Sequence, residues 1–172
     1  NYLELPQAID YFKLFGSWAK VSSDLSPYQT EAYYTNNGVF GGNVKLQYPN
    51  GLVNADINPE SSTSFELGAS TAFLKNTFSL DVTYYNVIDT NQIIDLPISN
   101  TSGFENRKVN GNEYTTNGLE VVLNTTPIRT NNFKWDIGTN WSRKVRKITE
   151  IYGENDTYNN LKLNERADSY YA

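Results

Sequence analysis

The sequence predicts an all-β chain: an antiparallel, up-and-down sheet of about five or six strands, forming an incomplete segment of a transmembrane β-barrel. Three observations lead to this prediction: long runs alternate apolar and polar residues, the connections are alternately short and long, and strand and turn formers dominate the composition. The 172 residues include 23 Asn, 16 Thr, 13 Tyr and 11 Gly, and they contain no Cys, His or Met. The expected strands cover about residues 11–22, 61–75, 77–92, 114–127 and 131–146.

Alternation is clearest between Ser61 and Ser142. In the first run, every second residue from Phe65 to Phe73 is apolar or Thr, and the residues between them are small or polar. The pattern returns in Phe78–Tyr85, Gly118–Asn124 and Phe133–Ser142. Such runs approach the 9–11 residues that a tilted strand needs to cross a bilayer, whereas soluble strands average about 5–6. The run length therefore favours a membrane barrel over a soluble β-sandwich, which also alternates.

Short and long connections follow one another along the chain. A two-residue turn is expected at Lys75-Asn76 and a short connection at 125–132, whereas 23–60, 93–113 and 147–164 are long. In an up-and-down sheet, the short turns then gather at one end and the long loops at the other. Outer-membrane barrels have short periplasmic turns and long extracellular loops. Five or six strands cannot close such a barrel, so we expect further strands from a longer chain.

The charged residues, and the absence of Cys and His, limit which functions and sites are possible. Four expected strands each carry one carboxylate on the polar face, and a water-filled lumen is the interpretation for Glu66, Asp81, Glu120 and Asp136. The net charge of −5 argues against a nucleic-acid partner. Without Cys or His, the usual zinc, copper and haem sites are excluded, and no metal or cofactor is expected. A calcium site built from oxygen ligands in the loops stays open as an alternative. The basic cluster Arg143-Lys144-Arg146-Lys147 is interpreted as a solvated strand end.

Several motifs, in order, resemble SusC/RagA-type TonB-dependent receptors. They include the strand start Asn58–Gly68, the hairpin Phe73–Tyr85 with its Tyr-Tyr end, Asn117-Gly118-Leu119-Glu120, and Asn132–Trp135 with Asn140-Trp141-Ser142. Tyr11–Trp18 resembles an earlier strand of the family, with Phe15 in place of the usual Arg. The family's plug and TonB-box regions have no counterpart here.

The resemblance implies a 22-stranded barrel in the outer membrane of a Gram-negative bacterium. It implies import of a glycan or peptide, a SusD-like surface lipoprotein as lid, energy from the TonB complex through the plug, contact with outer-membrane lipid, and no enzyme activity.

Aromatic residues in the long loops are the candidate ligand contacts. Aromatic faces and amide side chains suit sugars, although Tyr and Asn are also ordinary loop residues of such barrels. The candidates are Tyr33, Tyr34, Phe104, Tyr114, Tyr152 and Tyr158, with Tyr28 and Tyr48 nearby. Three alternatives stay open: a soluble carbohydrate-binding β-sandwich, a passive porin, and a glycosidase that uses two of the wall carboxylates.

Overall fold

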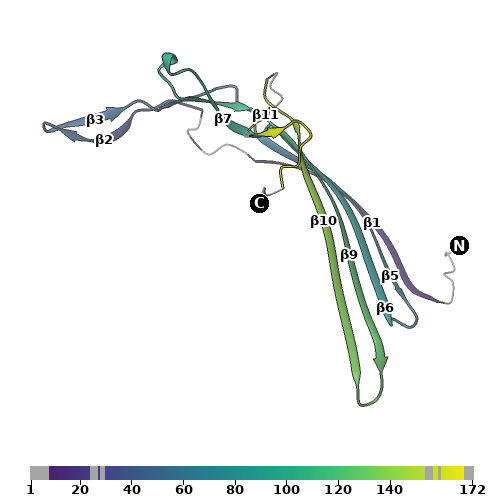
Figure 1. Cartoon of the computed structure of the whole chain (residues 1–172). Helices are drawn as coiled ribbons and strands as arrows, with labels where there is room; N and C mark the ends of the chain where they lie inside the picture. Colours follow the sequence, from purple (N-terminus) through teal and green to yellow (C-terminus); the bar gives the residue numbers. More distant parts are fainter. Residues whose placement is uncertain (1–7, 24–26, 28–29, 154–156, 159, 169–172) are drawn as a thin grey trace.

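The computed structural model describes residues 8–23, 27, 30–153, 157–158 and 160–168. Its main element is a five-stranded antiparallel sheet in the order β1-β5-β6-β9-β10. The strands are β1 (Ile9–Ser23), β5 (Glu60–Phe73), β6 (Phe78–Thr90), β9 (Glu113–Arg129) and β10 (Lys134–Glu150). Each pairs with the next long strand along the chain, which gives the up-and-down arrangement visible in Figure 1. The predicted all-β, antiparallel fold class is confirmed, and the sheet is not closed into a barrel within this chain.

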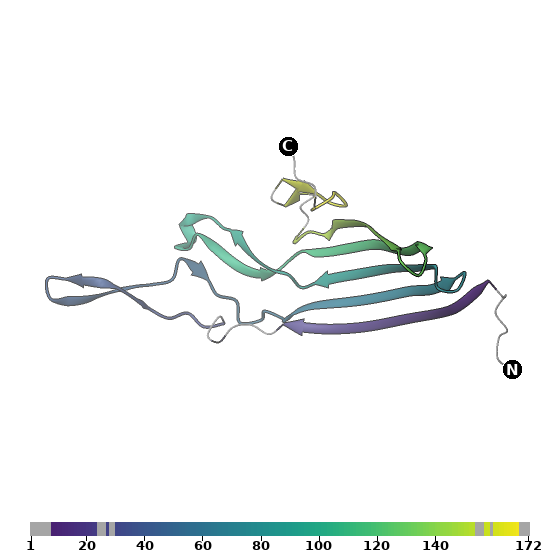
Figure 2. The same ribbon diagram turned by 90° about the horizontal axis from the view of Figure 1, so that it is seen from below.

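The long sheet is a single layer. Figures 1 and 2 show it as a curved wall, and no second sheet of the described residues packs face to face against its strands. Large apolar side chains are consequently exposed on it: Leu14 is 66% and Trp18 67% exposed. A soluble β-sandwich buries such side chains between two sheets, so that alternative does not describe this part of the chain.

The register of the sheet separates two faces, because directly paired residues point the same way and successive residues point opposite ways. Val121, for example, pairs with Val82 and Trp141, whereas Val122 pairs with Asp81 and Asn140. We define the apolar face as the even-numbered residues 12–20, the odd-numbered 63–73, the even-numbered 78–88, the odd-numbered 115–125 and the odd-numbered 137–147. The polar face consists of the residues between them.

The two tight turns lie at one end of the sheet. Phe73 pairs with Phe78, so four residues, Leu74–Thr77, connect β5 and β6 instead of the expected two. The predicted Lys75-Asn76 are the central pair of this turn, because the Thr77 amide donates to the Leu74 carbonyl over 3.2 Å. Leu74, Lys75 and Asn76 all adopt the left-handed backbone conformation, with φ of 55°, 57° and 56°. Three successive left-handed residues reverse the chain without a glycine, which costs conformational energy.

The β9–β10 hairpin reaches further than the β5–β6 hairpin (Figure 1). Phe78 pairs with Thr125, and β9 runs on to Arg129 before it turns into β10. This stagger of about four residues over two strands is what tilted strands produce when their turns end at a common level. Pro127 lies inside β9, at the point where the β9–β10 register shifts.

The long connections at the other end are themselves folded, which the alternation of the sequence did not predict. The first contains the hairpin of β2 (Thr35–Phe40) and β3 (Asn43–Gln47), then β4 (Gly51–Leu52). The second contains β7 (Ile93–Pro97), a 3-10 turn at Asn100–Ser102 and β8 (Asn106–Asn110), and the third contains β11 (Thr157–Tyr158) and β12 (Leu161–Lys162). β4 joins β8 in parallel, so the first two connections share one small sheet.

In the described part of the chain, no helix is long and apolar enough to cross a membrane.

The buried apolar side chains gather where these connections meet the wall. We call this cluster the loop base; it consists of the apolar residues Ile57, Ile94, Val109, Ile148 and Ile151 together with the buried amide residue Asn112. Asn110, beside it, accepts a hydrogen bond from the Asn58 amide (2.7 Å) and donates to the carbonyls of Asn58 (2.8 Å) and Asn91 (2.9 Å). One amide side chain therefore fixes the start of β5 against the end of β6.

Candidate ligand-binding site

The four predicted lumen carboxylates share one face of the wall. Glu66, Asp81 and Glu120 lie on the polar face by register, and Asp136 lies on it beside Thr126, whose hydroxyl donates to it over 2.6 Å. No two of them pair directly across strands. They are spread along the wall, and the Lys134 ammonium pairs with Asp136 at 2.7 Å. No group of three metal-ligating side chains forms among the described residues.

Two aromatic rings lie flat over glycines on the same face. Phe15 pairs with Gly68 and Tyr85 with Gly118. A Cβ added at Gly68 would lie 2.1 Å from Cζ of Phe15, and one at Gly118 would lie 2.1 Å from Cζ of Tyr85. The glycines therefore let the rings lie against the wall instead of standing out from it.

Three aromatic rings join the first two long connections. Tyr34 and Tyr48 meet edge to face with ring centroids 5.3 Å apart, and Tyr48 and Phe104 are 5.7 Å apart. We call these residues the aromatic cluster. Tyr34 is 63% and Tyr48 45% exposed, so the rings remain available to a ligand from outside. The structure thus brings together two of the predicted contacts, Tyr34 and Phe104, through Tyr48.

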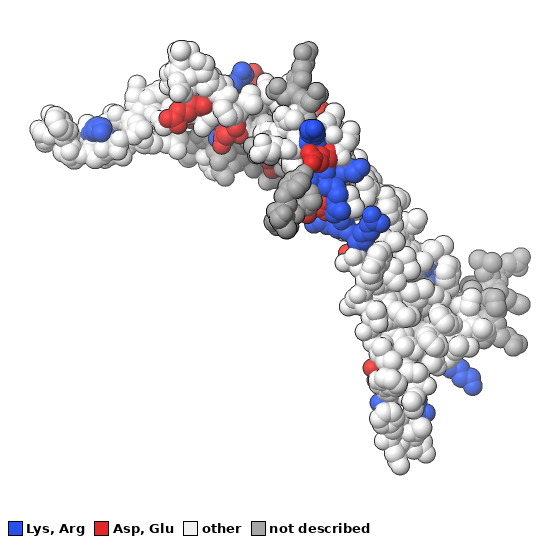
Figure 3. All heavy atoms as spheres, viewed as in Figure 1, with Lys and Arg blue, Asp and Glu red and all other residues white. Residues whose placement is uncertain are grey.

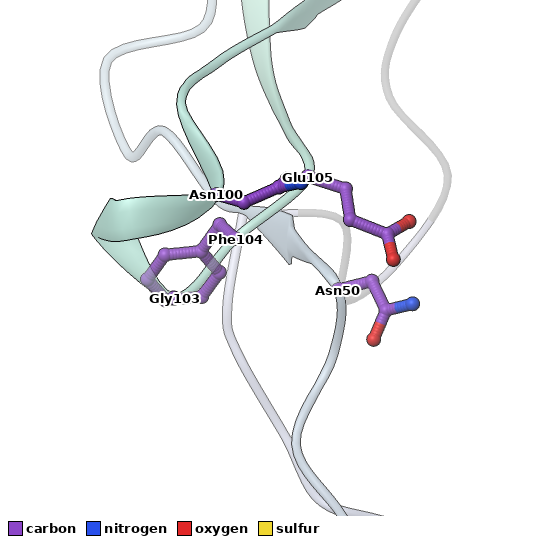
Figure 4. Close-up of a pocket in the computed structure, with 5 residues that line it drawn as sticks. All are labelled: Asn50, Asn100, Gly103, Phe104 and Glu105. Carbon is purple, nitrogen blue, oxygen red and sulfur yellow. The ribbon is translucent and has the colours of Figure 1, made fainter.

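A hollow of about 230 Å³ opens beside the cluster (Figure 4). Its lining combines one ring, from Phe104, with polar groups of Asn50, Asn100 and Glu105. The backbone amide of Glu105 donates to the Asn50 carbonyl over 2.9 Å, which holds the two connections together at this point. Apolar area with a few polar groups around it is the usual composition of a small-molecule site.

Tyr33 lines a different and larger hollow of about 390 Å³, with Glu31, Pro49, Val53 and Lys108 among its neighbours. Lys108 also pairs with Asp95 across 3.1 Å. Tyr33 and the aromatic cluster therefore face separate depressions of the same outer surface.

Tyr114, named above among the loop aromatics, lies in a strand: β9 begins at Glu113, one residue before it and one residue before the expected strand 114–127. It lies on the polar face, where the Arg146 guanidinium stacks over its ring at 4.4 Å. Arg146 also reaches Asp89 at 3.3 Å. Tyr114 thus belongs to a small charged cluster at the outer end of the wall, away from the aromatic cluster.

Tyr152 and Tyr158 lie on the third connection and are half-buried. The Tyr152 amide donates to Oδ1 of Asn112 over 3.2 Å, which ties this connection to the loop base. Nearby, the Arg166 guanidinium donates to Asp168 and holds the pKa of that carboxyl below its usual value. Tyr28 lies outside the described residues.

Sequence reasoning missed the polar residues of the first hollow and the ring-over-glycine pairs. Glycines inside alternating strands were a usable signal for the pairs, since a strand glycine often marks a close approach. Nothing local marks Asn50 or Asn100, because their place depends on contact between two connections, and these two residues are 50 positions apart in the 172-residue sequence.

The comparisons with known proteins agree with this geometry. The family model described as TonB dependent receptor-like, beta-barrel matches residues 3–170. TonB-dependent receptor P3 of Formosa agariphila is 25% identical over 164 residues, which cover 92% of this chain and 16% of that protein. TonB-dependent receptor P26 of the same organism is 25% identical over 159 residues, 89% of this chain and 16% of that protein.

The solved structure of the RagAB peptide transporter has a similar fold, with a TM-score of 0.82 and 18% identity over 95% of this chain and 19% of that one. The chain thus spans about a sixth of the length of its curated relatives. It belongs to the TonB-dependent receptor-like β-barrel family, as its resemblance to SusC/RagA-type receptors predicts.

Proposed function

We propose that this chain supplies part of the wall and three external connections of an outer-membrane importer in a Gram-negative bacterium, and that no reaction occurs in it. The observation that carries the proposal is the asymmetry of the wall. One face is largely apolar on all five strands, and the other carries the dispersed carboxylates. Among the described residues, the folded connections lie at the end opposite the tight turns. A lipid-facing side, a lumen side and an outer surface account for these three features.

In this proposal, the aromatic cluster helps to capture the ligand, a peptide or an oligosaccharide. Exposed rings beside amide and carboxylate groups can stack on a sugar or on an apolar side chain while hydrogen-bonding its polar groups. The RagAB neighbour is a peptide transporter, which supports a peptide as one ligand class. A SusD-like lipoprotein would close over the connections, and the TonB complex would supply energy through the plug of the 22-stranded barrel.

Ligand capture can be tested on the full receptor, purified in detergent with its lipoprotein. The triple change Tyr34→Ala, Tyr48→Ala and Phe104→Ala should weaken binding of the accepted ligand at least tenfold, because buried aromatic contacts dominate binding energies. Binding is measured by calorimetry against a peptide mixture and an oligosaccharide mixture. Phe133→Ala, at the opposite end of the wall, is the matched control. Unchanged binding by the triple variant would exclude the cluster from capture.

Import can be tested in the source bacterium. Deletion of the receptor gene should abolish uptake of the captured ligand, and restored uptake should require an intact TonB complex. Uptake that continues at the same rate without TonB would point to a passive porin.

A further inference from the structure

The apolar face carries three charged residues in the described strands, Lys20, Arg143 and Lys147, and all three are cations. On the polar face, by contrast, cations and carboxylates are mixed, and Arg146 there pairs with Asp89 at 3.3 Å. Among the described residues, no carboxylate lies within ion-pairing distance of Lys20, Arg143 or Lys147. The apolar face therefore has an uncompensated positive charge.

The position of this charge along the wall is defined by the tight turns. At about 3.3 Å per residue and a tilt of 35–45°, the roughly ten residues from Phe133 to Arg143 rise about 25 Å. That is about the height of the apolar band of outer-membrane barrels. Arg143 therefore lies at the outer edge of the band, and Lys147 lies about four residues nearer the folded connections. Figure 3 shows Lys and Arg, with some Asp and Glu among them, gathered toward the folded connections, above a long stretch of the wall with few charges.

Arg143 stands among amphipathic rings. It lines a shallow hollow of about 240 Å³ on the wall with Tyr84, Leu119, Trp141 and Val145. Tyr84 and Trp141 are 42% and 51% exposed on this side, and the Tyr84 hydroxyl donates to Asn117 over 3.0 Å. Tyr and Trp of this kind mark the depth at which a membrane changes from hydrocarbon to headgroup.

We propose that Arg143, flanked by Tyr84 and Trp141, binds a phosphate group of an outer-leaflet lipid, with Lys147 as a second cation. The occupant follows from charge and setting: a guanidinium without a carboxylate, in apolar surroundings at headgroup depth, is complementary to an anionic headgroup whose acyl chains lie along the wall below. The long side chain of Arg143 can reach toward the headgroups while its stem stays against the apolar face. This inference rests on the proposed function, since it requires the wall to face the outer leaflet.

The test uses the full receptor and two probes: diphosphoryl lipid A, and the same lipid with its phosphates removed. Bound lipid is counted by native mass spectrometry after titration in detergent. Arg143→Gln should weaken binding of the diphosphoryl lipid about tenfold or more, as expected for lost charge-assisted hydrogen bonds. Binding of the dephosphorylated lipid should not change. Arg143→Lys should keep part of the phosphate preference. Lys144→Gln, one residue along but on the polar face, is the matched control and should leave both unchanged.

Two results would overturn the inference: equal binding of the diphosphoryl lipid by Arg143→Gln and the unchanged receptor, or an equal loss of both lipids. The inference would also be overturned if a protein, and not a lipid, stays bound at Arg143 when the receptor is purified. Folding is checked by the different migration of boiled and unboiled receptor on a gel. If the unchanged receptor is absent from the outer-membrane fraction, the proposed function fails; if it is present but shows no phosphate preference, only this inference fails.

Discussion

The two faces of the five-stranded wall are built from the same strands, yet they differ in which side chains they carry and in where their charges lie. The apolar face places Leu67, Val82, Val121 and Trp141 outward with no buried partner layer, and its few charges lie at the outer edge. The polar face carries carboxylates along its length and lays Phe15 and Tyr85 over glycines. A soluble sheet needs its apolar face covered by protein. The described residues leave the apolar face of this sheet uncovered, which agrees with the proposal that lipid covers it.

The largest expected effect comes from placing a charge on one face and then on the other. Leu123→Lys should lower the free energy of unfolding in lipid by about 2–4 kcal/mol, because a Lys near the bilayer midplane has no water to solvate it. Val122→Lys, the adjacent residue on the polar face, should change it by no more than about 0.5 kcal/mol. Both are measured by urea unfolding of the full receptor in lipid vesicles. Equal losses from the two variants would mean that the faces share one environment.

The second-largest effect is expected when a side chain is added at a strand glycine, because the loss of stability should differ between the two faces. Gly118→Ala places a Cβ 2.1 Å from Cζ of Tyr85, so the ring must move, at a cost of about 1–3 kcal/mol. In Gly16→Ala, on the apolar face, the nearest atom lies at an ordinary 3.6 Å, and little change is expected. Urea midpoints compare the two variants. A Tyr85→Ala background should remove most of the Gly118→Ala cost, and an undiminished cost there would contradict the ring-over-glycine account.

The loop base sharpens the comparison, because its side chains are buried by the protein itself. Asn110→Ala removes the acceptor for the Asn58 amide and two donated hydrogen bonds. Local opening of residues 50–60 and 91–112 should become easier by about 1–2 kcal/mol. Hydrogen exchange followed by mass spectrometry should show faster exchange there, with no change in β5, β6 or the inner half of β9. Faster exchange throughout the wall would show that the two regions unfold as one unit.

The smallest effect is expected for the charged cluster on the polar face. Arg146→Gln removes a half-exposed ion pair with Asp89 and the contact with the Tyr114 ring. The loss of stability should stay under about 1 kcal/mol and shrink in high salt, because water in the lumen already screens the pair. Urea midpoints at low and high salt measure it. A loss of several kcal/mol that does not change with salt concentration would mean that this cluster lies in an interior without water.

The wall could be predicted from the sequence because its signal is local. Residues two apart repeat the same environment, so Phe65, Leu67 and Ala69 reveal one face without any knowledge of their partners. The turn at Leu74–Thr77 was harder, since three left-handed residues without glycine have no clear sequence signal. Tyr114 was grouped with the loop aromatics although the expected strand 114–127 begins at this residue, and β9 begins at Glu113.

The site could be predicted only in part, because it forms between distant segments. The sequence indicated that Tyr34 and Phe104 are candidates, but their link through Tyr48 depends on the pairing of Gly51–Leu52 with Asn106–Arg107. No alternation of apolar and polar residues within either segment predicts that pairing. The burial of Ile57, Ile94 and Val109 likewise results from two connections that meet, so each apolar residue looks unremarkable in its own segment.

The alternation of environment along β9 tests the account most directly. The chain has no Cys, so single cysteines can be placed at residues 119–124 of the full receptor, with any cysteine elsewhere replaced, and labelled with a fluorophore. Lipid-borne and water-soluble quenchers are then compared in outer-membrane vesicles. Labels at 119, 121 and 123 should be quenched from the lipid, and those at 120, 122 and 124 from water. Quenching without this period of two would contradict a wall between lipid and lumen.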